Sequence, residues 1–140
     1  MSEKLTNTRW FGYAIQALVL LARHGGVCAS NEMAGMLDSR STYLRKILSF
    51  LVKAELIQAK EGREGGYSLA RPADEITLAD VYHAMKVEDP FTKGLMESTS
   101  DECQTAEITK QNFEQLGREI DTVICTELNR KTIADLIPSA

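Results

Sequence analysis

Residues 41–69 read STYLRKILSFLVKAELIQAKEGREGGYSL, and this stretch decides how the rest of the chain is interpreted. Its first half places apolar residues on one face at helical spacing, namely Leu44, Ile47, Leu48, Leu51 and Val52. The opposite face is polar and basic, and Ser41 offers a hydroxyl oxygen that can cap a helix start. The first half is therefore predicted to be an amphipathic helix.

The second half of the stretch predicts a short β-hairpin. Leu56, Ile57 and Ala59 lead into a charged turn at residues 60–64, and Tyr67 and Leu69 alternate again after it. Between them Gly65 and Gly66 permit backbone angles that other residues avoid. A helix followed directly by such a hairpin is the second half of a winged helix-turn-helix, which places a helix in the major groove and the wing tip against the backbone or minor groove.

The residues upstream supply the first half of that unit. Residues 10–23 have an apolar helical face, and Gly25-Gly26 should end this helix. Ser30 can cap a second, short helix over residues 31–37. Asp38-Ser39-Arg40 then forms the turn before the third helix, which is the spacing expected of a helix-turn-helix pair.

Downstream of the wing, Thr77 should cap another helix, since Asp80 lies three residues on, close to a capping box. Pro90 is expected to end this segment. Residues 91–105 are polar and contain glycine, so they are predicted to be a mobile loop.

A long helix is then expected to start at Gln104 or Thr105, with a final short helix over residues 133–137 capped by Thr132. The long helix has an apolar stripe made of Ile108, Phe113, Leu116, Ile120, Val123, Ile124 and Leu128. We interpret this stripe as the seam of a homodimer; packing onto its own domain is the alternative. The predicted fold class is mostly α (α+β), with a winged helix-turn-helix domain at residues 1–88 and a sensing loop and dimerisation helices at 89–140.

Composition and charge narrow the function. No apolar run is long enough to cross a bilayer, no signal peptide is evident, and three scattered cysteines argue for a reducing cytoplasm. The net charge of −4 hides an asymmetry: residues 1–71 carry +4 and residues 72–140 carry −8. The first half could neutralise phosphates of double-stranded DNA, although an unevenly charged solvated surface is the plainer reading.

Candidate DNA contacts follow from this arrangement. Ser41, Thr42, Tyr43 and Arg45 would lie on the first exposed turn of the third helix, and the Arg45 fork matches the O6 and N7 atoms of guanine. The alternative for Tyr43 is that its ring packs within the protein. Arg9, at the entry of the first helix, is a further candidate for contact with DNA, and the alternative is that it is simply solvated. The remaining candidates, expected to contact phosphates or shape the wing, are Ser30, Lys46, Lys53, Lys60, Arg63, Gly65, Gly66 and Tyr67.

The chain resembles the Rrf2 family of transcriptional regulators almost from end to end. The most specific parts are the wing together with the segment Ile76-Thr77-Leu78-Ala79-Asp80-Val81. The other matching segments are Tyr13-Ala14, Glu32-Met33-Ala34, Tyr43-Leu44, Ile47-Leu48, residues 53–57, Leu69-Ala70-Arg71-Pro72 and residues 132–136. The resemblance implies homodimers with crossed C-terminal helices that bind dyad-symmetric operators and act chiefly as repressors.

Two departures from that family matter. Members with iron–sulfur clusters often carry three closely spaced cysteines before the long helix, whereas here that loop holds Cys103 alone. Because a cluster needs several thiolates at one point, we expect no cofactor and no metal. Members also often have an arginine before the first wing glycine, whereas here Glu61 stands there. Either Arg63 is the cation at the wing tip, or the wing binds DNA only weakly.

The signal that controls DNA binding stays open between three hypotheses. Cys103 could act as a thiol sensor, although Asp101 and Glu102 beside it would lower its reactivity. A small molecule could bind between the long helix and the DNA-binding half, near Phe91, Phe113 or Tyr82. A partner protein could dock on the acidic half, in which case the chain is partly a regulatory interaction module.

The pattern of residues does not favour an enzyme. His24 and His83 are the only histidines, and His24 sits at a helix end where capping explains it. No nucleophile–base pairing, phosphate-binding glycine loop or metal-ligand spacing is evident.

Overall fold

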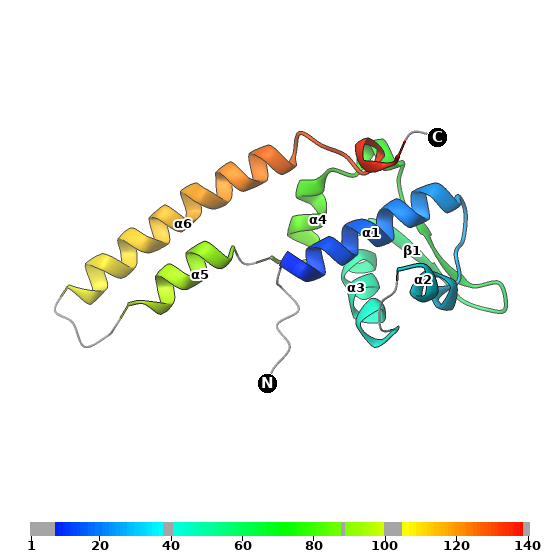
Figure 1. The fold of residues 1–140 in the computed structure, drawn as a ribbon, viewed down its shortest axis with the longest axis horizontal. Coiled ribbons are helices and arrows are strands. Elements are labelled where there is room, and N and C mark those ends of the chain that lie inside the picture. Colours follow the sequence, from blue (N-terminus) through cyan, green and yellow to red (C-terminus); the bar gives the residue numbers. More distant parts are fainter. Residues whose placement is uncertain (1–7, 38–40, 88, 100–104, 139–140) are drawn as a thin grey trace.

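The computed structural model describes residues 8–37, 41–87, 89–99 and 105–138. The first part of the chain forms α1 (Thr8–His24), α2 (Ser30–Leu37), α3 (Ser41–Lys53) and the antiparallel strands β1 (Ile57–Lys60) and β2 (Gly66–Leu69). The second part forms η1 (Ala73–Glu75), α4 (Leu78–Ala84), α5 (Pro90–Glu97), α6 (Ala106–Leu128) and η2 (Ala134–Leu136). The predicted fold class, mostly helical with a two-stranded wing, is confirmed (Figure 1).

The core forms where α1 and α3 bury the apolar faces that the sequence predicts. On α3, Leu44, Ile47, Leu48 and Leu51 are at most 2% exposed, and Val52 is half-buried at the edge. They pack with the buried face of α1, which comprises Trp10, Ala14, Ala17, Leu18 and Leu21. Since burying each large aliphatic side chain contributes about 1.5–3 kcal/mol, this face fixes which side of α3 points outward.

The connection from α3 to the wing is a Schellman turn. The N–H of Leu56 donates to Leu51 O at 3.0 Å and the N–H of Glu55 donates to Val52 O at 2.9 Å. Glu55 adopts a left-handed conformation with φ of 61°, and Leu56 is buried next to the helix end. This turn aims β1 away from α3 within three residues.

The wing has the predicted hairpin form, with Ile57 opposite Leu69 and Lys60 opposite Gly66. Gly66 has φ of 154°, and a Cβ at this position would lie 2.2 Å from the carbonyl oxygen of Cys28. Cys28 and Tyr67 pair through both backbone bonds, Cys28 N to Tyr67 O at 2.8 Å and Tyr67 N to Cys28 O at 2.9 Å. The loop between α1 and α2 is thereby attached to β2.

After the wing, the structure confirms the predicted start of α4 and contradicts the loop predicted after it. Thr77 and Asp80 form a complete capping box at the start of α4. Residues 91–105 were expected to be a loop after a terminating Pro90, but Pro90 is the first residue of α5. Asp89 caps this helix through bonds from the N–H groups of Phe91 and Thr92, and proline suits the first helical position because its missing N–H would be unsatisfied there.

The long helix α6 lies beside α5, away from α1–α3 (Figure 1). Gly117 is buried at the contact with α5, where an added Cβ would lie 2.4 Å from Thr92 Cγ2. After α6 the chain returns to the first unit, where Ile133 is fully buried and its N–H donates to Ile76 O at 2.9 Å. The predicted last helix is present as the shorter 3-10 turn η2, whose N-cap residue is Ile133. Thr132 and Asp135 of η2 exchange reciprocal backbone-to-side-chain hydrogen bonds across its start.

Candidate nucleic-acid interface

The outward face of α3 carries the basic residues that were predicted from the sequence to contact DNA. Arg45, Lys46 and Lys53 are all exposed. Tyr43 is half-buried, and its ring meets Trp10 edge to face with centroids 5.2 Å apart, which is the packing alternative considered above. The side chains of Ser41 and Thr42, including the proposed cap, lie outside the described residues.

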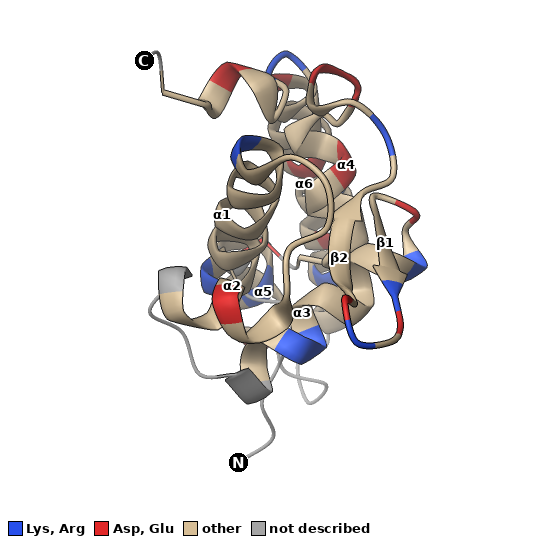
Figure 2. Cartoon of the chain, turned by 90° about the vertical axis from the view of Figure 1, so that its right-hand side faces the viewer, with Lys and Arg blue, Asp and Glu red and all other residues tan. Residues whose placement is uncertain are grey.

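The wing adds a mixed-charge tip next to that face. Lys60 and Arg63 are exposed, but Glu61 and Glu64 are exposed beside them. Figure 2 shows Lys and Arg on α3 and on the hairpin, where Asp and Glu are interspersed with them. The wing tip therefore offers cations to a phosphate backbone and carries carboxylates that a phosphate would repel.

The other wing candidates hold the hairpin together. Gly65 could not accept a side chain, since a Cβ would lie 2.3 Å from Lys60 O. Gly66 and Tyr67 meet Cys28 as described, and the half-buried Tyr67 packs against the core. These three residues therefore shape the wing, and their contact with DNA stays a prediction.

Two further candidates lie on the first two helices. Arg9 is exposed in the first turn of α1. Ser30 is half-buried as the first residue of α2, where the N–H of Glu32 is satisfied by Asn31 Oδ1 at 2.9 Å. An exposed carboxylate, Glu32, sits in the same turn. It makes this helix start less favourable to a phosphate than its backbone alone would be.

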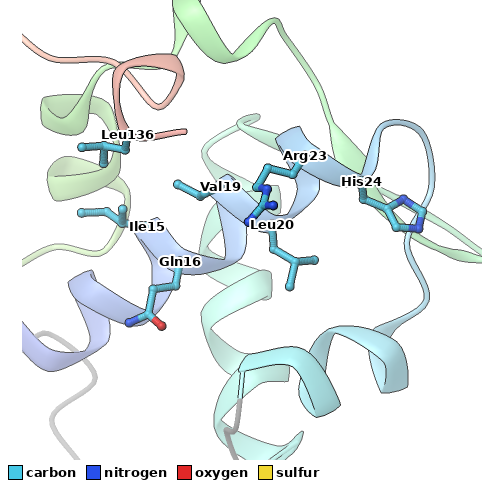
Figure 3. Close-up of a pocket in the computed structure, with 7 residues that line it drawn as sticks. All are labelled: Ile15, Gln16, Val19, Leu20, Arg23, His24 and Leu136. Atoms are coloured by element: carbon cyan, nitrogen blue, oxygen red, sulfur yellow. The ribbon is translucent and has the colours of Figure 1, made fainter. Parts of the chain in front are cut away.

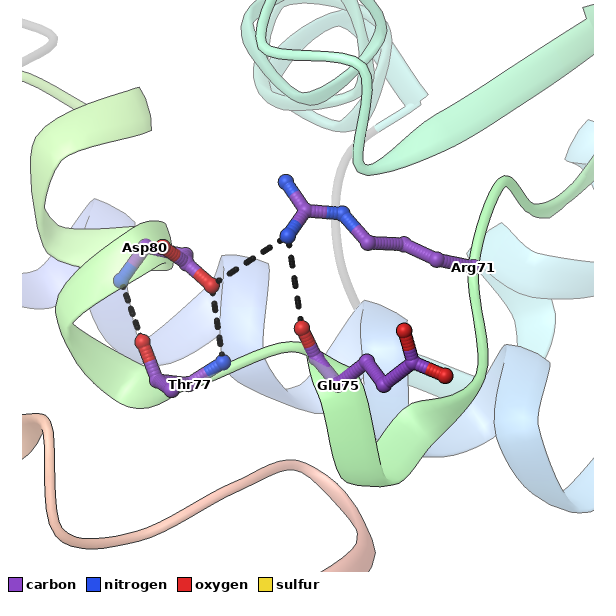
Figure 4. Close-up of polar contacts among 4 residues, drawn as sticks. All are labelled: Arg71, Glu75, Thr77 and Asp80. Carbon is purple, nitrogen blue, oxygen red and sulfur yellow. Dashed lines mark hydrogen bonds and ion pairs between the residues drawn. The ribbon is translucent and has the colours of Figure 1, made fainter.

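Arg71 is a cation of the basic half that the structure uses internally. Its Nη1 atom lies 3.6 Å from Asp80 Oδ2 and donates to Glu75 O at 3.3 Å (Figure 4). Asp80 also accepts the N–H bond from Thr77 in the capping box. The Ile-Thr-Leu-x-Asp-Val segment thus joins the end of the wing to α4, a role that the sequence pattern alone did not reveal.

The apolar stripe of α6 divides between two environments. Leu128 packs against the core, and Phe113, Ile120 and Ile124 are half-buried. Ile108, Leu116 and Val123 are 64%, 40% and 68% exposed. The end of the stripe near Leu128 therefore packs onto its own chain, whereas the exposed positions form an uncovered apolar face, and the dimer seam stays a prediction.

The cysteines of the described residues do not converge. Cys28 is buried beside β2, and burial, followed by the nearby Glu32 carboxylate, raises the pKa of its thiol. Cys125 lies on α6, where burial and Asp121 raise the pKa of its thiol. The described residues do not fit an iron–sulfur cluster, which needs several thiolates at one point. Cys103, the candidate sensor, lies outside the described residues.

The described residues include a hollow on each of two sides of the protein. One, of about 660 Å³, runs along the outer side of α1 and is lined by Ile15, Val19, Leu20 and Leu136, with Arg23 and His24 at one end (Figure 3). The other, of about 510 Å³, lies between Val87, α5 and Asp121 of α6. The second hollow is close to the region where a small-molecule site was predicted. In the described residues, no helix is long and apolar enough to cross a membrane.

Comparison with known proteins agrees with this geometry. The profile of the Rrf2 family, described as iron-dependent transcriptional regulators, matches residues 7–139. The chain is 41% identical over 71 residues to Rv1287 of Mycobacterium tuberculosis, which is named as an HTH-type transcriptional regulator; the match covers 49% of this chain and 44% of that protein. The chain thus spans about half the length of the curated relatives it matches.

Solved structures show the same fold. CymR of Staphylococcus aureus is 21% identical with a TM-score of 0.66, covering 95% of this chain and 98% of CymR. IscR of T. potens is 24% identical with a TM-score of 0.65, covering 92% of this chain and 83% of IscR. The family and its named members are transcriptional regulators and not enzymes. With nearly its whole length matched by the family profile, this chain belongs to the Rrf2 family.

Proposed function

We propose that this protein is a sequence-specific DNA-binding repressor that acts as a homodimer on a dyad-symmetric operator in the cytoplasm. The observation that carries the proposal is the basic outward face of α3 beside the wing. Arg45, Lys46 and Lys53 are exposed on α3, and Lys60 and Arg63 are exposed on the hairpin. A helix and a wing with this charge suit a major groove and its flanking phosphates.

In this proposal, the two parts of the chain have different roles. Residues 1–88 bind DNA, and residues 89–140 form the dimer and receive the signal. The exposed Ile108, Leu116 and Val123 support the dimer, because an apolar face of this kind on a long helix is stabilised when a symmetry mate covers it.

Three hypotheses remain for the signal that releases the protein from DNA. A small molecule is supported by the hollow of about 510 Å³ beside Asp121, which lies next to the joint between the two units. Thiol oxidation would act at Cys103, and a partner protein would dock on the acidic half. In the case of a docked partner, the chain is partly a regulatory interaction module.

A gel-shift assay against genomic fragments tests the proposal, beginning with the fragment upstream of the protein's own gene. We expect a retained fragment that survives excess random competitor, with dimer stoichiometry in the complex. A protein that is monomeric in dilute solution and retains no fragment over competitor would contradict the proposal.

A further inference from the structure

Three side chains with metal-ligating atoms meet where α1, α2 and the wing join. They are His24 at the end of α1, Cys28 at the bridge to β2, and Glu32 in the first turn of α2. A ring nitrogen of His24, the Cys28 sulfur and a Glu32 oxygen all lie within 4.8 Å of one another. The Cys28 Sγ to Glu32 Oε2 distance is 3.9 Å.

This convergence depends on a break in the helix. The three residues are four apart in sequence, as on one face of a single helix, but Gly25 and Gly26 adopt φ values of 70° and 73° and end α1 between them. The ligand atoms therefore come from three separate elements. For that reason the sequence shows no recognised metal-binding spacing.

We propose that His24, Cys28 and Glu32 bind one divalent transition metal ion of the zinc type. Imidazole nitrogen, thiolate sulfur and carboxylate oxygen are the donors that such borderline ions take together. Three protein ligands leave one position of a tetrahedral ion for water, which is the pattern of an exchangeable site. The three ligands belong to the N-terminal half of the sequence, whereas the cysteines that the family resemblance associates with a cluster precede the long helix.

The distances suit this assignment with small movements. Tetrahedral ligands at metal distances of about 2.0–2.3 Å lie roughly 3.6 Å apart, so the present separations must shrink by about an ångström at most. His24 and Glu32 are exposed and can move, whereas Cys28 is buried and held by its two backbone bonds to Tyr67. The ion replaces the thiol proton, which is released to solvent.

The second coordination sphere is also present for the histidine. His24 Nδ1 lies 3.0 Å from Gly25 O, and since a carbonyl only accepts, Nδ1 carries the proton in this bond. With that bond intact, Nε2 is the nitrogen left to coordinate. A ligating histidine usually donates its other N–H to a carbonyl or carboxylate in this way.

Bound metal would tie the end of α1, the start of α2 and the wing to one point. A ligand that binds only the folded state stabilises it, by about 2.7 kcal/mol when its concentration is a hundred times Kd. The proposal does not rest on the DNA-binding function, because metal binding and stabilisation can be measured without DNA.

The test is a Co²⁺ titration of the full-length reduced protein, followed by absorption spectroscopy and thermal unfolding. We expect one equivalent to bind, with a thiolate-to-cobalt charge-transfer band and a raised Tm, and Zn²⁺ should displace the Co²⁺. Cys28→Ser should abolish the band. His24→Gln and Glu32→Gln, both at exposed positions that should not disturb folding, should each weaken binding about tenfold or more.

Matched controls make the result specific. Cys125→Ser removes a thiol that also lies beside a carboxylate, Asp121, at 3.8 Å, and Cys103→Ser removes the third thiol. His83→Gln removes the other histidine, which is exposed on α4. All three should leave the band and its affinity unchanged. No thiolate band in the wild type, a band lost with either control cysteine, or unchanged affinity in both His24→Gln and Glu32→Gln would overturn the proposal.

Discussion

The hydroxyl group of Tyr82 on α4 donates a hydrogen bond of 2.8 Å to Asp121 Oδ1 on α6, joining the N-terminal unit to the long helix. Tyr82 is buried and also meets Phe11 of α1 edge to face, with centroids 5.8 Å apart. A single side chain therefore contacts both α1, which packs under the candidate DNA-binding face of α3, and the helix that carries the exposed apolar residues.

Replacing Tyr82 with Phe should remove that connection with little loss of packing. We expect the free energy of unfolding to fall by about 1–2 kcal/mol, since the lost bond has a charged acceptor. Burial, then Asp121, raises the pKa of Tyr82 in the folded protein. Above about pH 10 the unfolded tyrosine therefore loses its proton while the folded one keeps it, and stability falls by up to about 1.4 kcal/mol per pH unit.

Urea unfolding of wild type and Tyr82→Phe from neutral to alkaline pH checks this sign. The variant should lack that part of the alkaline loss, so the two stabilities should converge as the pH rises. Parallel curves would show that Tyr82 does not titrate as described.

Gly66→Ala should destabilise the protein by about 2 kcal/mol or more, because the new Cβ meets the Cys28 carbonyl and the backbone angle is one that L side chains rarely adopt. Gly35→Ala is the control, since Gly35 is helical with open space around it and should gain about 0.5–1 kcal/mol. Thermal unfolding of both variants measures the difference. Equal effects would mean that the wing does not need this close approach.

Arg45→Ala should cost about 1–3 kcal/mol of operator affinity at one base position per half-site, as expected for a lost guanine contact. Competition binding against operators mutated at single positions reports this loss. Ser49→Ala, at another exposed position of α3, is the control. An equal loss on operator and random DNA would remove the base-reading role from Arg45.

Arg63→Ala should weaken binding to all sequences and lower the slope of log K against log salt by about one per wing contact. Glu61→Gln should act in the opposite direction, because it removes a neighbouring carboxylate from the same exposed tip. Binding at two or more salt concentrations measures both slopes. A salt dependence unchanged by either substitution would show that the wing tip does not contact phosphate.

Val123→Lys should convert the proposed dimer to monomers, since it places a charge at an exposed apolar position of α6. Glu114→Lys makes a larger charge change at an exposed position on the opposite side of the same helix and should leave the dimer intact. Sedimentation velocity distinguishes the two. A dimer that survives Val123→Lys would place the seam elsewhere.

Sequence was sufficient where a structure is specified by neighbouring residues. The apolar stripe of α3, the glycine-bounded hairpin and the Thr77–Asp80 capping box all depend on contacts within a few residues, and all are present. The same local logic was misapplied at Pro90. Proline can end a segment, but Asp89 before it is a cap and Pro90 is the first residue of α5.

Tertiary structure alone decided which distant residues meet. Three long-range contacts depend on how α1, the wing and α6 pack: Gly66 with Cys28, Tyr82 with Asp121, and Ile133 with the core. No periodicity or motif in the sequence predicts contacts between residues so far apart along the chain. The His24, Cys28 and Glu32 side chains converge for the same reason, because two glycines redirect the chain between them. The sequence by itself determined the helices, the wing and the charges they carry, since these follow from local periodicity and composition. Packing determined which partners those charges find, placing the partly exposed Arg71 within 3.6 Å of Asp80 and leaving Arg45 exposed.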